Sequence, residues 1–249
     1  MTRHAFITGG GSGIGAAAAR RLVADGCKIS IAGRDLLKLE AVATGLSGAC
    51  AVVCDVTEEE SVAAAMEEAV RHHGPVSILV NNAGIAPSAP FVKTSRAEFD
   101  RTIATNLTGA FLCARAVLPG MIARGFGRIV NVASTAALKG YPYVSAYVAA
   151  KHGVLGLTRA LALEVAAKGV TVNAVCPGFT DTDIVARSVE TIVAKTGRTP
   201  EEARAELARA NPQGRLLTPE EVAETIAWLC RPESGGINGA AVPISGGEV

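Results

Sequence analysis

Aromatic residues are scarce in this sequence, and neither sign of charge is in excess. Only 4% of the 249 residues are aromatic, and 24 Lys and Arg against 23 Asp and Glu leave a net charge of +1. So few rings argue against a surface that stacks sugars or bases. The balanced charge provides no positive field for a phosphate backbone. We therefore expect no nucleic-acid partner.

The sequence also lacks paired cysteines, metal-ligand spacing and long apolar runs. Its six cysteines form no C-x-x-C pair and lie in apolar stretches, which is typical of core residues in a reducing compartment. Its four histidines are not spaced with acids as metal ligands are, so we expect no metal. No unbroken apolar run reaches the ~18 residues of a membrane span, and the N-terminal run is too short for a signal peptide. We expect a cytoplasmic protein without a membrane partner.

What the sequence does contain is an alternation of short apolar runs with longer helical patterns. The apolar runs predict strands at residues 5–8, 28–32, 49–54, 78–80, 128–132, 171–175 and 241–244. The patterns between them predict helices at residues 14–24, 36–46, 57–73, 95–124, 147–167 and 218–231. Three of these helices open on Ser/Thr-x-x-Glu, which predicts capping boxes at Thr57, Ser95 and Thr218. The alternation predicts an α/β fold of βαβ units, with a parallel sheet and helices on both faces.

No linker, repeat or low-complexity stretch divides the chain, so we expect a single domain over residues 1–249. The alternation is interrupted by a polar, helix-prone insertion at residues 180–211, between the sixth strand and the last long helix. Long connections of this kind often cover a site. The insertion is therefore predicted to be a substrate-binding lid.

A glycine-rich loop follows the first expected strand and opens the first expected helix. It reads Thr-Gly-Gly-Gly-Ser-Gly-Ile-Gly over residues 8–15. Glycines let the backbone approach a pyrophosphate, and a helix N-terminus offers free N–H groups and positive potential. Alone, the loop could be only a tight turn, but its place in a βαβ unit indicates dinucleotide binding. No Gly-Lys-Ser/Thr follows, which excludes a nucleoside-triphosphate P-loop.

The loop has the spacing G-x-x-x-G-x-G, and further motifs follow it in order along the chain. These are Asn81-Asn82-Ala83-Gly84, Asn106, Ser134, Tyr147, Lys151 and Pro177-Gly178. Together they resemble the short-chain dehydrogenase/reductase family over essentially the whole chain. The resemblance implies a Rossmann-like, doubly wound, seven-stranded parallel sheet of order 3-2-1-4-5-6-7, with ligands at the carboxyl ends of the strands.

The resemblance also implies which residues bind a nicotinamide cofactor. Asp55 and Val56, after the third strand, would contact the adenine. Alternatively, the only role of Asp55 could be to start the following helix. The loop after the sixth strand would contact the nicotinamide carboxamide, with Thr182 in the place of the family's threonine. The full expected set is Gly9, Ser12, Gly13, Ile14, Gly15, Arg34, Asp55, Val56, Asn82, Ala83, Gly84, Tyr147, Lys151, Pro177, Gly178, Thr180 and Thr182.

The end of the second expected strand bears on the choice between NADP and NAD. An NAD enzyme carries Asp or Glu about 20 residues beyond the glycines, where it holds the ribose 2′-hydroxyl. This chain has Gly33 there, followed by Arg34, whose guanidinium can grip a 2′-phosphate. We therefore expect NADP(H). NAD(H) is the alternative, because Asp35 could turn toward the ribose, Arg34 could pair with Asp35 or lie in solvent, and Ser12 stands where many NADP enzymes carry a second cation.

Tyr147 and Lys151 lie four residues apart on one expected helix, so both face the same side. Hydride transfer to a ketone needs a group that protonates the nascent alkoxide. A free tyrosine has a pKa of about 10, and a neighbouring ammonium would lower that pKa. Such pairs are common on amphipathic helices, and Tyr141 and Tyr143 compete for the role. Neither competitor has a lysine four residues later.

The resemblance adds two members to this group. Ser134 would donate a hydrogen bond to the substrate carbonyl oxygen, and Asn106 would bend its helix and hold a water that links Lys151 to solvent. Alone, Ser134 could merely cap a strand, with Thr135 partly replacing it, and Asn106 could be a turn residue. In the family's order, Asn106, Ser134, Tyr147 and Lys151 predict a catalytic site.

The motifs predict a ketone or secondary alcohol as substrate and constrain its size only weakly. They resemble those of 3-oxoacyl thioester reductases and polyketide ketoreductases, so the first expectation is NADP(H)-dependent reduction of a 3-oxoacyl thioester. A small free aromatic or alicyclic ketone or alcohol is the alternative, because the insertion is longer than in short fatty-acid reductases. A non-catalytic NADP-binding regulator is a third interpretation, which the intact catalytic residues disfavour. The expected substrate contacts are Ser134, Thr135, Ala136, Tyr141, Tyr147 and Phe179.

The family usually forms tetramers or dimers through long helices. Residues 105–124 and 147–167 are rich in Ala and Leu, which is compatible with such packing. A homotetramer or homodimer is therefore expected.

Overall fold

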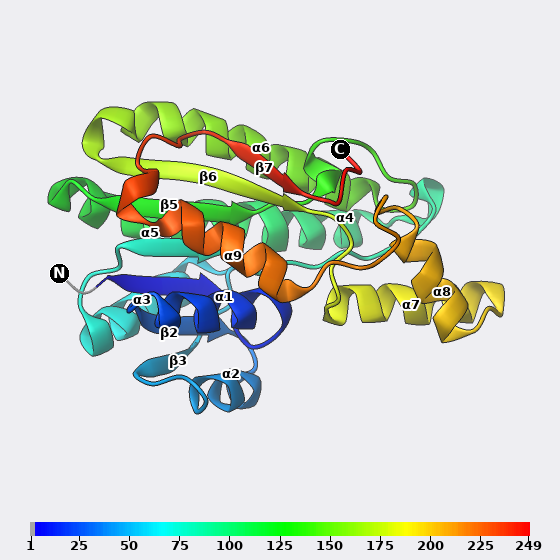
Figure 1. Cartoon of the computed structure of the whole chain (residues 1–249), viewed down its shortest axis with the longest axis horizontal. Coiled ribbons are helices and arrows are strands. Elements are labelled where there is room, and N and C mark those ends of the chain that lie inside the picture. Colours follow the sequence, from blue (N-terminus) through cyan, green and yellow to red (C-terminus); the bar gives the residue numbers. More distant parts are fainter. Residues whose placement is uncertain (1–2) are drawn as a thin grey trace.

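Seven parallel strands form one sheet at the centre of the molecule (Figure 1). The computed structural model describes residues 3–249. The strands are β1 His4–Thr8, β2 Lys28–Gly33, β3 Ala49–Val53, β4 Ile78–Asn81, β5 Gly127–Val132, β6 Val170–Pro177 and β7 Ala241–Ile244. Their order is β3-β2-β1-β4-β5-β6-β7, as predicted. Because β1 pairs with both β2 and β4, the winding reverses beside β1, which is where ligands of such sheets bind.

Helices cover both faces of the sheet. They are α1 Gly13–Ala24, α2 Leu36–Ala43, α3 Glu59–His73, α4 Arg96–Ile103, α5 Gly109–Arg124, α6 Ser145–Val165, α7 Asp183–Thr196, α8 Pro200–Ala208 and α9 Pro219–Cys230. Buried residues of α1 and α9 form the core on one face, and those of α3, α5 and the end of α6 form the core on the other. This two-sided arrangement is the predicted one.

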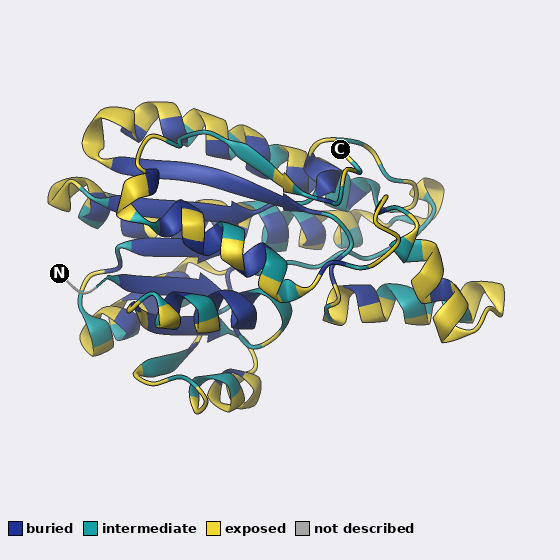
Figure 2. Cartoon of the chain, viewed as in Figure 1, coloured by how far each residue is buried: buried dark blue, intermediate teal, exposed yellow. Residues whose placement is uncertain are grey.

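Successive side chains of a strand enter opposite cores. Ala5 and Ile7 of β1 belong to the core of α1 and α9, and Phe6 between them belongs to the core of α3 and α5. All three side chains are fully buried, and Figure 2 shows the central strands buried along their length. Both faces of the central strands are buried under helices, and this explains why the sequences of these strands are unbroken apolar runs.

α4 and α5 join through a π-helical turn, Ala104–Thr108. By length and composition alone, the resulting helical segment Arg96–Arg124 could cross a membrane. A core helix passes the same test, and the buried side of α5, which includes Leu112, Cys113 and Met121, packs into the core beneath the sheet. This packing accounts for its apolar character.

The expected capping boxes have different outcomes at two helix starts. At α9 the Thr218 hydroxyl accepts from the Glu221 N–H and the Glu221 carboxylate accepts from the Thr218 N–H, so the box forms. The box expected at Thr57 is wrong. Both the N–H and the hydroxyl of Thr57 donate to Asp55 Oδ1, at 3.0 and 2.8 Å. α3 therefore begins later, at Glu59.

The insertion at residues 180–211 contains α7 and α8, which extend beyond the carboxyl ends of the strands (Figure 1). α8 opens on a capping box at Thr199, with the same Thr-Pro-Glu-Glu sequence as α9. Much of both helices is exposed (Figure 2), but Val185 and Ala203 are buried. The insertion is helical as expected, and its role as a lid stays a prediction.

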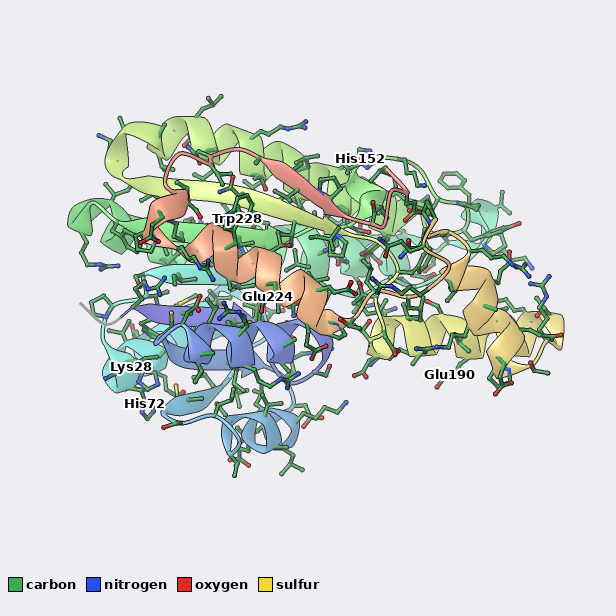
Figure 3. All side chains as sticks on the ribbon, in the orientation of Figure 1. Lys28, His72, His152, Glu190, Glu224 and Trp228 are labelled. Atoms are coloured by element: carbon green, nitrogen blue, oxygen red, sulfur yellow. The ribbon has the colours of Figure 1, made fainter. Side chains whose placement is uncertain are left out.

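A buried histidine lies at the opposite end of the sheet, where Figure 3 labels Lys28 and His72. His4 is 1% exposed. Its Nδ1 lies 2.7 Å from the Gly74 carbonyl oxygen and its Nε2 lies 2.8 Å from Ser30 Oγ. Burial lowers the pKa of His4 to about 4, although the Gly74 carbonyl acts in the opposite direction. The imidazole is therefore neutral in the folded protein near pH 7.

This histidine should make folding stability depend on pH. Its folded-state pKa lies below the ordinary value of 6.5, so the stability it contributes is complete above pH 6.5 and is lost as the pH falls toward 4, by about 3 kcal/mol. We expect His4→Gln to lower the urea midpoint at pH 7.5 and to flatten its decline toward pH 4.5. His72→Gln, at an exposed position, should keep the wild-type profile. An unchanged slope in His4→Gln would contradict this assignment.

Candidate active site

The glycine loop joins β1 to α1 at the carboxyl edge of the sheet. Gly9 and Gly13 have φ angles of 64° and 51°, a left-handed conformation that residues with side chains rarely adopt. Ser12 occupies the N-cap of α1 but caps no N–H group, and its hydroxyl donates to Asp183 instead, at 3.0 Å. The first turn of α1 also contains no acidic residue. Its free N–H groups and helix dipole can therefore receive an anion.

Asn82 holds this loop against the end of β4. Its amide group donates to the carbonyl oxygens of Thr8 and Gly9, at 3.0 and 3.1 Å. The Thr8 hydroxyl accepts from the N–H groups of Asn82 and Ala83, at 2.9 and 3.0 Å. A Cβ on Gly15 would lie 2.3 Å from the Gly9 oxygen and 2.6 Å from the Asn82 amide nitrogen. α1 can approach these hydrogen bonds so closely only because position 15 is glycine.

Arg34 extends from the end of β2 with its side chain 75% exposed. Its Nη1 lies 4.0 Å from Asp55 Oδ2, so the carboxylate nearest to it belongs to Asp55 and not to Asp35. The Asp35 carboxylate instead accepts from the Lys38 N–H at 3.2 Å, as the N-cap of α2. This hydrogen bond holds the Asp35 carboxylate, the group that could have turned toward a ribose, at the start of α2.

Asp55 and Val56 follow β3. Burial alone would raise the pKa of Asp55, but the hydrogen bonds from Thr57 and the charge of Arg34 outweigh it and lower that pKa. Asp55 thus shapes the turn into α3 through Thr57 and also faces Arg34. The Val56 side chain packs so closely on Gly109 of α5 that a Cβ there would lie 2.7 Å from it.

Ser134, Tyr147 and Lys151 come together where β5 ends and α6 begins. Ser134 Oγ accepts from the Ala136 N–H at 3.1 Å, which leaves the serine proton free to donate. Lys151 Nζ lies 5.5 Å from the centroid of the Tyr147 ring. Nζ also donates to the carbonyl of Val132, the last residue of β5, at 2.7 Å. The end of β5 therefore holds both the serine and the lysine beside the tyrosine.

Burial sets the proton affinities of this group. It lowers the pKa of Lys151, which is 4% exposed, to about 8. Burial also raises the pKa of Tyr147, while the Ser134 hydroxyl acts in the opposite direction. The lowered tyrosine pKa expected from the neighbouring ammonium is therefore not found. Removing the phenolate from water outweighs the hydrogen bond from Ser134.

Asn106 lies in the π-helical turn and is 3% exposed. Its amide donates to the carbonyl oxygens of Ile85 and Thr102, both at 2.9 Å, and its Oδ1 accepts from the Ile85 N–H at 3.3 Å. Asn106 and Lys151 line a small cavity of about 10 Å³. That volume is close to the minimum that one water needs.

A larger cavity of about 490 Å³ opens at the same edge of the sheet. The structure brings all four expected catalytic side chains to this one space, because each of them lines it. Its other expected lining residues are Ile14, Asn82, Gly84, Thr135, Ala136, Tyr141, Pro177, Gly178, Phe179, Thr180 and Thr182. α7 and α8 add Ile184, Val185, Ser188, Thr191, Ile192, Glu206 and Leu207.

The remaining expected cofactor residues lie outside this cavity, along the glycine loop and the strand ends. They are Gly9, Ser12, Gly13, Gly15, Arg34, Asp55, Val56 and Ala83. α7 connects the two regions, because Asp183 bonds to Ser12 and a Cβ on Gly13 would lie 3.0 Å from the Thr182 methyl carbon. Glu190 on α7 is exposed and points away from the sheet (Figure 3). Within residues 3–249, no group of three or more His, Cys, Asp or Glu could hold a metal ion.

Sequence reasoning missed two side chains near the site. Glu248 accepts a hydrogen bond from the Tyr141 hydroxyl, and the glycine pair at 246–247 just before it is a turn signal that could have drawn attention to it. Lys38 packs over the glycine loop, because a Cβ added to Gly11 would lie 3.2 Å from the Cβ of Lys38. A basic residue one turn into the helix that follows Arg34 was the available signal.

Comparison with known proteins agrees with this geometry. A family model described as Enoyl-(Acyl carrier protein) reductase matches residues 9–248. The cis-4-hydroxycyclohexanecarboxylate dehydrogenase of Sinomonas cyclohexanicum is 42% identical over 98% of this chain and 96% of its own length. The chain belongs to the short-chain dehydrogenase/reductase family. It is therefore an oxidoreductase.

Other short-chain dehydrogenases/reductases match equally far along the chain. The acetoacetyl-CoA reductase of Rhizobium meliloti is 40% identical over 100% of this chain and 99% of its own length. A variant of actinorhodin polyketide ketoreductase, solved with NADPH, superposes with a TM-score of 0.95 at 37% identity, and the match covers 99% of this chain and 97% of that one. The predicted family and its fold are confirmed.

The contact at Gly15 gives a test of the glycine loop. In Gly15→Ala the added methyl would meet the Gly9 oxygen and the Asn82 amide, so we expect a loss of about 1–3 kcal/mol in unfolding free energy. We also expect weaker NADPH binding, measured by nucleotide fluorescence. Gly45→Ala is the matched control, since its Cβ would meet nothing closer than 3.6 Å. Equal behaviour of the two variants would show that the loop tolerates a side chain at position 15.

Proposed function

We propose that this short-chain dehydrogenase/reductase moves hydride between a nicotinamide cofactor and the carbonyl carbon of a ketone, or of the matching secondary alcohol. One observation carries the proposal. Ser134, Tyr147 and Lys151 line the same cavity of about 490 Å³ as Ile14 from the first turn of α1. The proton donors and the anion-binding helix end therefore share one space.

The residues at this edge of the sheet fit a dinucleotide. The uncapped first turn of α1 suits a pyrophosphate, and a Cβ on Gly9 would lie only 2.9 Å from the Asn82 amide nitrogen, so the loop keeps its backbone bare. Arg34 and Lys38, both exposed beside the end of β2, support NADP(H) because cations favour a 2′-phosphate. NAD(H) remains the alternative cofactor. When bound, the nicotinamide supplies or accepts the hydride.

Tyr147 and Ser134 act on the substrate oxygen in this proposal. Ser134 donates a hydrogen bond to the carbonyl oxygen, since the Ala136 N–H already occupies its own oxygen. Tyr147 then donates its proton to that oxygen as negative charge develops on it. Burial raises the pKa of Tyr147, which keeps the phenol protonated near neutral pH. This state suits the direction of reduction.

Lys151 supports the return of the proton to Tyr147. An ammonium has three protons, and the Val132 carbonyl accepts one of them. The small cavity that Lys151 shares with Asn106 has room for one water. A lysine with a pKa of about 8 can exchange protons with such a water and pass them toward the tyrosine.

The cavity supports a compact and largely apolar ketone. Tyr141 and Phe179 meet edge to face in its wall, with ring centroids 6.0 Å apart. α7 and α8 contribute Ile184, Ile192 and Leu207. An aromatic or alicyclic ketone fits this lining, and the 42% identical relative is named for the ring alcohol cis-4-hydroxycyclohexanecarboxylate.

A 3-oxoacyl thioester is the second candidate, supported by the 40% identical acetoacetyl-CoA reductase. Its carrier would bring phosphates to the cavity mouth. Cations around α8 are already paired within the chain, Arg204 with Asp181 and Arg209 with Glu206. This pairing reduces the positive charge that a CoA moiety would meet.

Replacing the tyrosine tests the proposed chemistry. We expect Tyr147→Phe to lower kcat by about 10²–10⁴-fold, because the proton donor is lost. NADPH affinity should stay close to that of wild type. The measurement is the initial rate of NADPH oxidation with cyclohexanone and, in parallel, with acetoacetyl-CoA. Ser47→Ala, an exposed hydroxyl deletion, is the control, and a Tyr147→Phe enzyme with full turnover would refute the mechanism.

The two substrates in that assay also separate the candidates. A higher kcat/KM for the ring ketone supports the compact substrate. A higher value for the thioester supports the second candidate and assigns CoA contacts to α7 and α8.

Replacing Arg34 tests the cofactor preference. We expect Arg34→Ala to raise the KM for NADPH about tenfold, the worth of a charge-assisted hydrogen bond, and to leave the KM for NADH unchanged. Arg71→Ala, at an exposed position on α3, should change neither value. An unaltered NADPH KM in Arg34→Ala would favour NAD(H). Assembly as a homotetramer or homodimer and a cytoplasmic location stay predictions from the sequence.

A further inference from the structure

The turn that follows β7 places a carboxylate just behind the cavity wall. The Glu248 side chain is only 3% exposed. Its Oε1 accepts from the Tyr141 hydroxyl and lies 3.0 Å from Lys139 Nζ. Its Oε2 is buried without a hydrogen-bond partner among the described residues. A Cβ on Gly178 would lie 3.1 Å from Oε2, so this oxygen stands behind a residue that lines the cavity.

Two glycines bring Glu248 to this position. β7 ends at Ile244, and Gly246 and Gly247 follow with φ angles of 61° and 97°, which turn the chain back on itself. The turn is tightly packed, because a Cβ on Gly246 would lie 1.9 Å from Asn211 Oδ1. The carboxylate is therefore held by the fold and is not a side chain of a loose tail.

The carboxylate decides the direction of a chain of hydrogen bonds. An ionised carboxylate can only accept, so the one proton of the Tyr141 hydroxyl is directed to Glu248. Burial and then this hydrogen bond raise the pKa of Tyr141, which keeps that proton in place. Thr135 Oγ1 lies 2.6 Å from the Tyr141 oxygen, and with the tyrosine proton engaged it must be the donor of that pair. The Thr135 hydroxyl has then used its proton, and toward a ligand its oxygen can only accept a hydrogen bond.

We infer that Glu248 is a positioning residue that makes this wall of the cavity accept hydrogen bonds, so that the site selects ketones carrying a hydroxyl group and disfavours ketones carrying a carboxylate. The inference rests on the proposed function. Thr135 follows Ser134 directly, so the accepting wall adjoins the place of the reacting carbonyl oxygen. A substrate hydroxyl can donate to this wall, whereas a carboxylate has no proton to donate and would meet only acceptors.

Three ring ketones test this selectivity: cyclohexanone, 4-hydroxycyclohexanone and 4-oxocyclohexanecarboxylate. With wild-type enzyme and NADPH we expect the highest kcat/KM for the hydroxyketone and the lowest for the carboxylate. In Glu248→Gln the new amide can donate to the Tyr141 oxygen, so the hydroxyl protons of Tyr141 and Thr135 are no longer held in one direction. We expect the preference for the hydroxyketone over the carboxylate to fall about tenfold, mainly through KM, while kcat for cyclohexanone stays within about twofold of wild type.

Two further variants separate positioning from general damage. Tyr141→Phe removes the middle hydroxyl and keeps the ring against Phe179, so it should lose the same selectivity, and the double variant should lose no more than either single variant. Glu233→Gln, an exposed position, should behave as wild type. Thermal unfolding of each variant checks that it is folded.

Binding to the NADPH-loaded protein gives a second measurement that needs no turnover, because neither an alcohol nor NADPH can accept a hydride from the other. Cyclohexane-1,4-diol should bind more tightly than cyclohexanol in wild type, and the difference should shrink about tenfold in Glu248→Gln. The inference is overturned if folded Glu248→Gln keeps the wild-type ratios, if it lowers all three kcat/KM values by one factor, or if wild type binds the two alcohols equally or binds neither. Absence of turnover with every ketone and thioester, with the diol preference intact, would instead reject the proposed function alone.

Discussion

The hydrogen bonds between Thr8 and Asn82 hold the functional edge of this protein together. They join the end of β1 to the end of β4, the two strands on either side of the switch point. The same amide of Asn82 also fixes the Gly9 carbonyl, and with it the path of the glycine loop into α1. Because the strands are parallel, their carboxyl ends share one edge of the sheet. Every candidate residue for cofactor and catalysis is positioned relative to that edge.

Burial is the second constraint, and it acts on chemistry as well as on packing. Lys151 lines the cavity with one carbonyl as hydrogen-bond acceptor, and burial lowers its pKa to about 8. The same burial raises the pKa of Tyr147. In this pair the Tyr147 phenol therefore keeps its proton, and Lys151 can exchange one. The π-helical turn at Asn106 brings an amide and a water-sized space next to this lysine.

One wall of the cavity is assembled from segments far apart in the chain. The turn after β5 supplies Thr135 and Tyr141, and the insertion supplies α7 and α8. Glu248, from the turn after β7, bonds to Tyr141 behind this wall. None of these segments belongs to the strands and helices of the core. The core can therefore stay constant while these segments change the shape and hydrogen-bonding character of the pocket, which matches the varied substrates named for the relatives.

The sequence alone determined the strands and helices, the glycine loop, the pairing of Tyr147 with Lys151 and the family, because each depends on local periodicity or on short motifs in a set order. It also misled locally, since the Thr57 capping box yields to a hydrogen bond with Asp55. Only the tertiary structure decided that Asp183 meets Ser12, 171 residues away, and that Glu248 meets Tyr141, 107 residues away. Such contacts follow from how whole elements pack, and no local pattern encodes them. For the same reason the proton affinities of Tyr147 and Lys151, which burial sets, could not be foreseen from their spacing.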